Sequence, residues 1–184
     1  MLEPVKALVW LAPEERERLD RERARERAKA IKSVLVSALK ERGWQRGPNS
    51  IWSWQGQDLR WCVRLDKGSW GPWHVELRAE WPAGGSGASA LRYWVSVGCD
   101  QIGPEDVARR DRFRWALDHH DPEPLDDRKA TLREIVLLIC GWAEATPSQH
   151  ALAHEMRAGV LRNPTSSPET RKLLGYEPKV DRQR

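Results

Sequence analysis

Two carboxylates, one just after an expected strand and one on the next strand, are the first residues of this chain that could do chemistry. Asp66 precedes Glu76-Leu77-Arg78, which loosely matches the Asp…Glu-x-Lys pattern of metal-dependent nucleases. In such a site the carboxylates hold a divalent cation, and the lysine helps to position or activate water. Arg78 stands in the lysine position and keeps its proton in proteins, so it cannot act as a base. The alternative interpretation is the solvated side of a half-buried strand.

Histidines offer two further candidate sites. His150 and His154 are four residues apart, which places both imidazoles on one helical face, as a zinc site requires. No H-E-x-x-H pattern and no third ligand accompany them. His119-His120-Asp121 could orient a general base, but no nucleophile is recognisable near them in the sequence. We therefore assign no catalytic residue, no metal and no cofactor, and the sequence favours a non-enzymatic protein without deciding the point.

Tryptophan is concentrated in the middle of the chain. The sequence contains 11 tryptophans and one phenylalanine, and most of the tryptophans fall between Trp44 and Trp94. A tryptophan-rich sheet has either an aromatic core or an aromatic binding face. Trp94 is out of phase with Tyr93 and Val95, so one of these aromatic residues must face outward. Outward tryptophans near arginines are typical of binding hot spots, although packing under another part of the chain is equally consistent with the pattern.

The candidate binding surface combines the tryptophans of two strands with arginines that alternate along the same sheet. It consists of Trp52, Trp54, Arg60, Arg64, Arg78 and Trp94.

One long helix is expected before these strands. Pro13 suits the first turn of a helix, acidic residues follow it, and Gly43 ends the pattern after Arg42. Residues 14–27 are almost entirely charged, whereas an apolar stripe over residues 28–39 indicates a core-facing side. The second half should pack on the domain, and the first half should project into solvent or contact a partner.

After this helix the sequence changes to strict alternation of apolar and polar residues. Four segments alternate in this way and indicate short strands: residues 51–55, 59–65, 73–81 and 91–97. Short connections between them predict an antiparallel meander with one solvated face. Three helices are expected to follow, opening near Pro104, Asp126 and Pro147. The predicted fold class is α+β, with a long N-terminal helix, a four-stranded antiparallel meander sheet, and three C-terminal helices packed on one face.

The length of 184 residues suits one domain with appendages. We expect a charged helical extension over residues 1–27, a single α+β domain over residues 28–162, and a tail over residues 163–184. The tail contains prolines and should be largely flexible apart from a turn around residues 169–174. Three widely spaced cysteines argue against a disulfide framework or a zinc ribbon. The apolar stretch at residues 7–12 is too short for a signal peptide or a membrane span. A cytoplasmic protein without membrane contact is the expectation.

A net charge of +4 and a pI near 9.1 make the chain mildly basic. With 31 Lys and Arg against 27 Asp and Glu, the surface should be mixed in sign. Such a balance permits nucleic-acid binding but does not require it.

Residues 39–77 resemble an uncharacterised bacterial family of small α+β domains, known only as a domain of unknown function. The matching pieces are Leu39-Lys40-Glu41-Arg42-Gly43-Trp44, Arg46, Ser50-Ile51-Trp52 and Lys67-Gly68-Ser69-Trp70. Tryptophan replaces the phenylalanines that are usual in that family, and nothing after Gly98 matches it. Those domains are similar to toxin-immunity proteins, so the resemblance implies protein binding and carries no active site.

The resulting hypothesis is a non-enzymatic protein-binding module, of the immunity or toxin-neutralising type, that acts by steric binding. Nucleic-acid binding through the same tryptophan- and arginine-rich face is the alternative, because bases stack on aromatic side chains. A metal-dependent nuclease around Asp66 and Glu76 is a third hypothesis. The expected partner is another protein of unknown identity, and the long helix could also join two copies of the chain.

Overall fold

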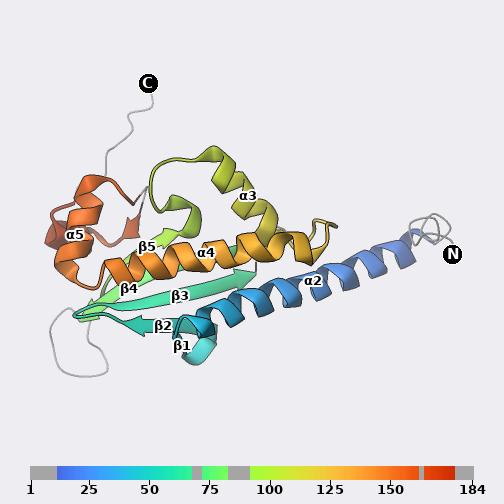
Figure 1. Cartoon of the computed structure of the whole chain (residues 1–184), viewed down its shortest axis with the longest axis horizontal. Coiled ribbons are helices and arrows are strands. Elements are labelled where there is room, and N and C mark those ends of the chain that lie inside the picture. Colours follow the sequence, from blue (N-terminus) through green and yellow to red (C-terminus); the bar gives the residue numbers. More distant parts are fainter. Residues whose placement is uncertain (1–11, 68–71, 83–91, 162–163, 177–184) are drawn as a thin grey trace.

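The computed structural model describes residues 12–67, 72–82, 92–161 and 164–176 (Figure 1). Within these ranges a long helix precedes a meander of strands, and further helices follow. The elements are α2 (Pro13–Glu41), β1 (Gln45–Arg46), η2 (Pro48–Ser50), β2 (Ile51–Gln55), β3 (Arg60–Lys67), β4 (Trp73–Pro82), β5 (Arg92–Gly98), η3 (Cys99–Gln101), α3 (Val107–Leu117), α4 (Leu125–Ala145), α5 (Gln149–Ala158), β6 (Thr165–Ser166) and α6 (Pro168–Leu174).

Helix α2 has 29 residues and confirms the long N-terminal helix expected from the sequence. Pro13 occupies its first turn together with two glutamates, whose negative charge suits the positive end of the helix dipole. Gly43 follows the helix with a φ of 78°, a left-handed conformation that glycine adopts without strain. Buried positions begin at Ala24 and recur to Leu39, so the core contact starts one turn before residue 28. The turns before Ala24 extend past the rest of the fold (Figure 1).

The sheet has six strands in the order β1-β2-β3-β4-β5-β6, and every neighbouring pair is antiparallel. The expected meander is therefore confirmed, but the count of four strands is wrong. The two additional strands, β1 and β6, contain two residues each and lie at the edges. Two residues are too few to produce an alternating pattern, so only pairing with β2 and β5 defines them.

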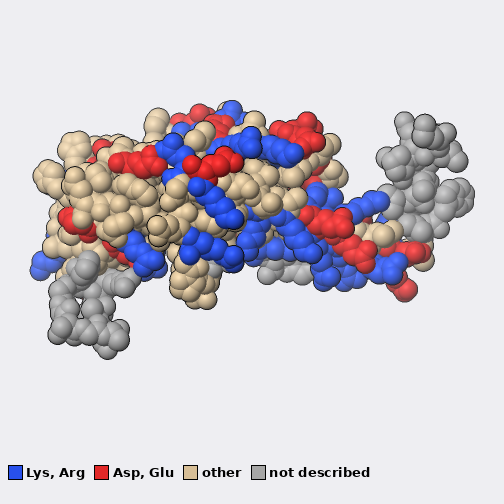
Figure 2. Space-filling view, turned by 60° about the horizontal axis from the view of Figure 1, so that its bottom comes forward, with Lys and Arg blue, Asp and Glu red and all other residues tan. Residues whose placement is uncertain are grey.

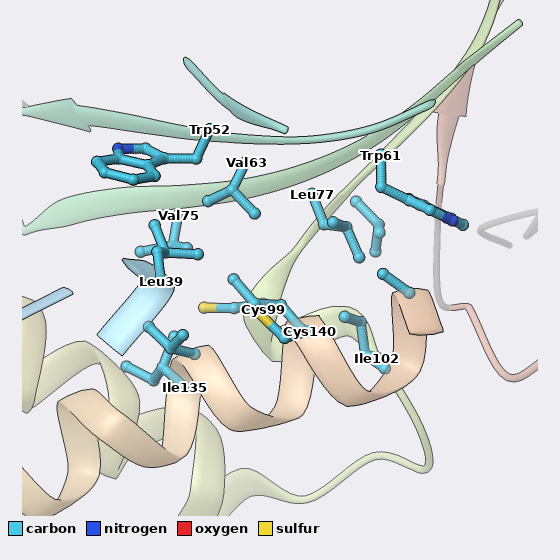
Figure 3. Packing of buried hydrophobic residues seen from close by; sticks show 14 of the residues in the cluster. Leu39, Trp52, Trp61, Val63, Val75, Leu77, Cys99, Ile102, Ile135 and Cys140 are labelled. Carbon is cyan, nitrogen blue, oxygen red and sulfur yellow. The ribbon is translucent and has the colours of Figure 1, made fainter. Parts of the chain in front are cut away.

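One face of the sheet forms the core with α2 and α4, which lie on the same side of it (Figures 1 and 3). Alternating residues of the central strands point toward α4, among them Val63, Leu77 and Trp61. The Trp61 indole Nε1 donates a hydrogen bond of 2.9 Å to the Thr146 carbonyl oxygen at the end of α4. Its ring packs edge-on against Trp142, with 5.1 Å between ring centroids. Most of the tryptophan-rich segment is therefore core.

The helices after the sheet number four in the described residues, α3 to α6, rather than three. The additional helix lies in the segment expected to be a largely flexible tail, where β6 pairs with β5 and α6 buries Thr170 and Leu174. Ser167 caps α6, because its Oγ accepts a hydrogen bond from the Thr170 backbone N–H. Residues 177–184 lie outside the described part of the chain, as do residues 1–11 of the expected extension. No described helix has the length and apolar character needed to cross a membrane.

Candidate functional site

The sheet face opposite α2 and α4 carries the polar half of the alternation. We call it the open face, because most of its side chains are partly or fully exposed. Half-buried Ile51 also faces this side. The other residues of the open face are Ser53, Gln55, Arg60, Cys62, Arg64, Asp66, His74, Glu76, Arg78, Glu80, Trp94 and Ser96. Only Cys62 and Ser96 are buried among them, at 6% and 4% exposure. Both lie opposite Arg78 in the strand register, one on each neighbouring strand.

Arg78 and Trp94 form the centre of this face. The Arg78 guanidinium lies over the Trp94 ring, 4.7 Å from its centroid, and Arg78 Nε is 3.1 Å from Glu80 Oε1. This cation–π contact orients both side chains. The Trp94 backbone N–H donates to Thr170 Oγ1 at 3.3 Å, which ties the strand to α6. Trp94 therefore faces outward on a fixed backbone, as the sequence indicated.

The remaining arginines of the open face are matched by carboxylates. Arg64 Nε is 2.7 Å from Asp66 Oδ2, and both side chains are about half exposed. Arg60 lies opposite Glu80 in the register, and Arg64 lies opposite Glu76. Three arginines and three carboxylates thus make a face of mixed charge. The candidate binding surface from the sequence contained the arginines but not Glu76 and Glu80, although alternation places all of them on the same side.

The assignment of Trp52 and Trp54 to the binding surface is wrong. Trp52 pairs with Val63 and is 2% exposed, and Trp54 pairs with Trp61 and packs against the core. Because paired residues in adjacent strands point to the same face, both indoles lie on the helix-covered side. Gln55 pairs with Arg60 next to the β2–β3 hairpin and lies on the open face. Alternation back along β2 from this pair places Trp54 and Trp52 on the opposite face, so their position follows once the strand register is known.

The two carboxylates of the nuclease hypothesis lie in the same groove. Asp66 and Glu76 line a groove of about 590 Å³ that also contains His74 and Asp100, with Arg110 and Arg114 contributed by α3. Asp66 is paired with Arg64, and Glu76 accepts a hydrogen bond from Ser96 Oγ. Among the described residues, no three acidic, histidine or cysteine side chains are arranged to hold a metal ion.

The histidines do not form a catalytic or zinc arrangement in the described part of the chain. His150 and His154 are exposed on α5, and His154 Nδ1 is 3.6 Å from Glu155 Oε1. His119 lies in the connection between α3 and α4 and is buried, at 1% exposure. Burial, with smaller contributions from neighbouring positive charges, lowers the pKa of His119. The Asp121 carboxylate accepts from Arg128 rather than orienting a histidine.

Comparison of the chain with protein families, curated proteins and solved structures finds no match. The resemblance of residues 39–77 to small immunity-like domains therefore stays a prediction.

Proposed function

We propose that this protein is a binding module for another protein and that the open face of its sheet is the contact surface. The observation that carries the proposal is the Trp94 ring, held outward beneath Arg78 on a sheet whose other face is the core. Tryptophan and arginine are the residue types most often found at the energetic centre of protein interfaces. A rigid sheet also loses little conformational entropy on binding.

The mixed charge of the open face favours a protein partner over nucleic acid. Asp66, Glu76 and Glu80 lie among the arginines and would face a phosphate backbone with like charge. A protein surface can instead match alternating charges, which orients the complex and excludes wrong partners. The resemblance to immunity proteins gives the proposal a specific form, in which this face covers part of a toxin and blocks it sterically.

The test compares two tryptophans in affinity capture from the native host. Trp94→Ala should remove a stoichiometric protein partner that wild type retains at high salt and after nuclease treatment. Trp115→Ala is the matched control, because Trp115 also lies against an arginine, Arg128, at 5.3 Å but belongs to α3 rather than the open face. Circular dichroism of both variants shows whether each remains folded.

Three outcomes separate the hypotheses. Loss of the partner only in folded Trp94→Ala supports the open face as the binding surface. Equal capture by wild type and Trp94→Ala contradicts it. Recovery of nucleic acid that is lost at high salt, in place of protein, would favour the alternative of strand binding, since phosphate contacts release counterions.

A further inference from the structure

A second surface, which shares no residue with the open face, has a concentration of positive charge. A groove of about 720 Å³ lies between α2, the end of β3 and the segment that connects α3 to α4. Arg21, Arg23, Arg25 and Arg27 line it from α2, and Lys67 lines it from β3. We call it the basic groove. Figure 2 shows Lys and Arg side chains gathered along α2, with the acidic side chains nearer its N-terminal end.

The cations of the basic groove are not neutralised by its carboxylates. Of the described residues, two acidic ones, Glu17 and Asp20, line it, and Glu17 is 3.6 Å from Arg21. The Arg27 side chain bonds to backbone rather than to a carboxylate in these contacts. Its Nε donates to the His119 carbonyl oxygen at 2.9 Å, and its Nη2 donates to that of His120 at 3.3 Å. Arg23 and Lys67 form no ion pair in the described part of the chain. The groove therefore keeps an excess of positive charge.

His119 supplies an independent indication that this groove receives a ligand. The residue lines the groove, is 1% exposed, and has a buried Nδ1 without a hydrogen-bond partner. It is one of eight such side-chain atoms among the described residues, and the one of them that lies in this groove. The His119 ring packs against that of His120, with 4.1 Å between centroids. Burial, His120, Lys67 and Arg27 all lower the pKa of His119, and only Asp118 opposes them.

We propose that the basic groove binds a small phosphorylated molecule through Arg23, Arg27 and Lys67, next to the buried His119 ring. Guanidinium groups match phosphate oxygens with paired hydrogen bonds, and lysine adds a compact positive charge. The volume of the groove falls within the range of small-molecule sites. This inference does not depend on the proposed protein-binding function, because the two surfaces have separate residues.

Inorganic pyrophosphate is the first probe, measured by isothermal titration calorimetry on the full chain at physiological salt. The variant Arg23→Gln/Lys67→Gln should weaken binding by at least about tenfold, because two charge-assisted contacts are lost. The matched control is Lys29→Gln/Lys40→Gln, which changes the net charge equally and alters α2 outside the groove. The control should change the affinity by less than about threefold, since it removes only screened, distant charge.

A second readout follows the His119 imidazole by NMR, with His119→Gln to assign its signal. Saturation with pyrophosphate should raise the pKa of His119, because a bound anion favours the charged imidazole. Absence of binding heat, or a His119 pKa that does not move, would overturn the proposal. Equal weakening by both double variants would also overturn it and indicate attraction to net charge alone.

Competition with a single-stranded DNA oligonucleotide separates the two sources of phosphate. The small-molecule site is supported if the oligonucleotide competes only weakly with pyrophosphate, and if Arg23→Gln/Lys67→Gln and Lys29→Gln/Lys40→Gln change this competition to different extents. Binding of the oligonucleotide far tighter than pyrophosphate, steeply dependent on salt and weakened by Lys29→Gln/Lys40→Gln, would assign α2 to a nucleic-acid backbone instead.

Discussion

Arg128 is the residue whose removal should affect this fold most sharply. It lies in the first turns of α4 with a side chain that is 1% exposed. Its guanidinium donates to the carbonyl oxygens of Asp118, Asp121 and Glu123 and to the Asp121 carboxylate. One buried arginine thus holds the whole connection between α3 and α4.

The expected cost of Arg128→Met follows from what it leaves behind. The Asp121 carboxylate loses its charged partner and keeps only the hydrogen bond from the Glu123 backbone N–H among its described contacts. Removing one member of a buried ion pair costs about 3–5 kcal/mol. Charged hydrogen bonds to three carbonyls would add about 1.5–3 kcal/mol each if the oxygens stayed dry. The connection can open and let water reach them, so we expect a loss of about 3–5 kcal/mol in the free energy of unfolding. The melting temperature should fall by roughly 10 °C.

Urea unfolding followed by circular dichroism measures this loss, and Arg112→Met provides the control. Arg112 Nη2 lies 2.6 Å from Glu134 Oε1, also between α3 and α4, but both side chains are close to half exposed. An exposed pair contributes less than about 1 kcal/mol. If Arg128→Met and Arg112→Met unfold within about 1 kcal/mol of each other, the connection is not held by the buried arginine and the reasoning fails.

Three further results are expected from buried groups. Because the pKa of His119 lies below its ordinary value of 6.5, the unfolded chain takes up the proton first, and stability should fall as the pH drops below that value. His119→Gln should remove this part of the pH dependence of urea unfolding; an unchanged profile would contradict it. The Cys99 and Cys140 thiols have pKa values raised to about 12 by burial, so alkylation mapped by mass spectrometry should be slow at pH 8 in native protein and fast in urea. Rapid native labelling would show that the helix–sheet core opens. Trp61→Phe should cost about 1–3 kcal/mol in urea unfolding by leaving the Thr146 carbonyl unpaired, and a neutral result would mean that water replaces the indole.

Local patterns were sufficient for α2 and for the four longer strands. The period of α2, its proline and glycine limits, and the alternation in β2 to β5 all come from contacts between residues that are close in sequence. For the same reason the outward position of Trp94 could be inferred from its phase against Tyr93 and Val95. The arginines of the open face followed from the same alternation.

Tertiary pairing decided what the local pattern left open. Trp52 and Trp54 alternate with polar residues, a pattern that fits either face of the sheet. The β2–β3 register decides that both point toward the core. The edge strands are too short to have a period and exist because β2 and β5 offer unpaired backbone groups. Helix α6 is ordered by its contact with β5, and the sequence of a proline-containing tail does not predict that contact.

The basic groove belongs wholly to the tertiary structure. Arg27 and His119 are separated by 92 positions, and no spacing rule connects them or either one to Lys67. The sequence by itself determined the long helices, the central strands and their polar sides, because those depend on periodicity within one element. Which faces are covered, and which distant charges meet, depended on how the elements pack, since side chains far apart in the sequence come together only through the complete fold.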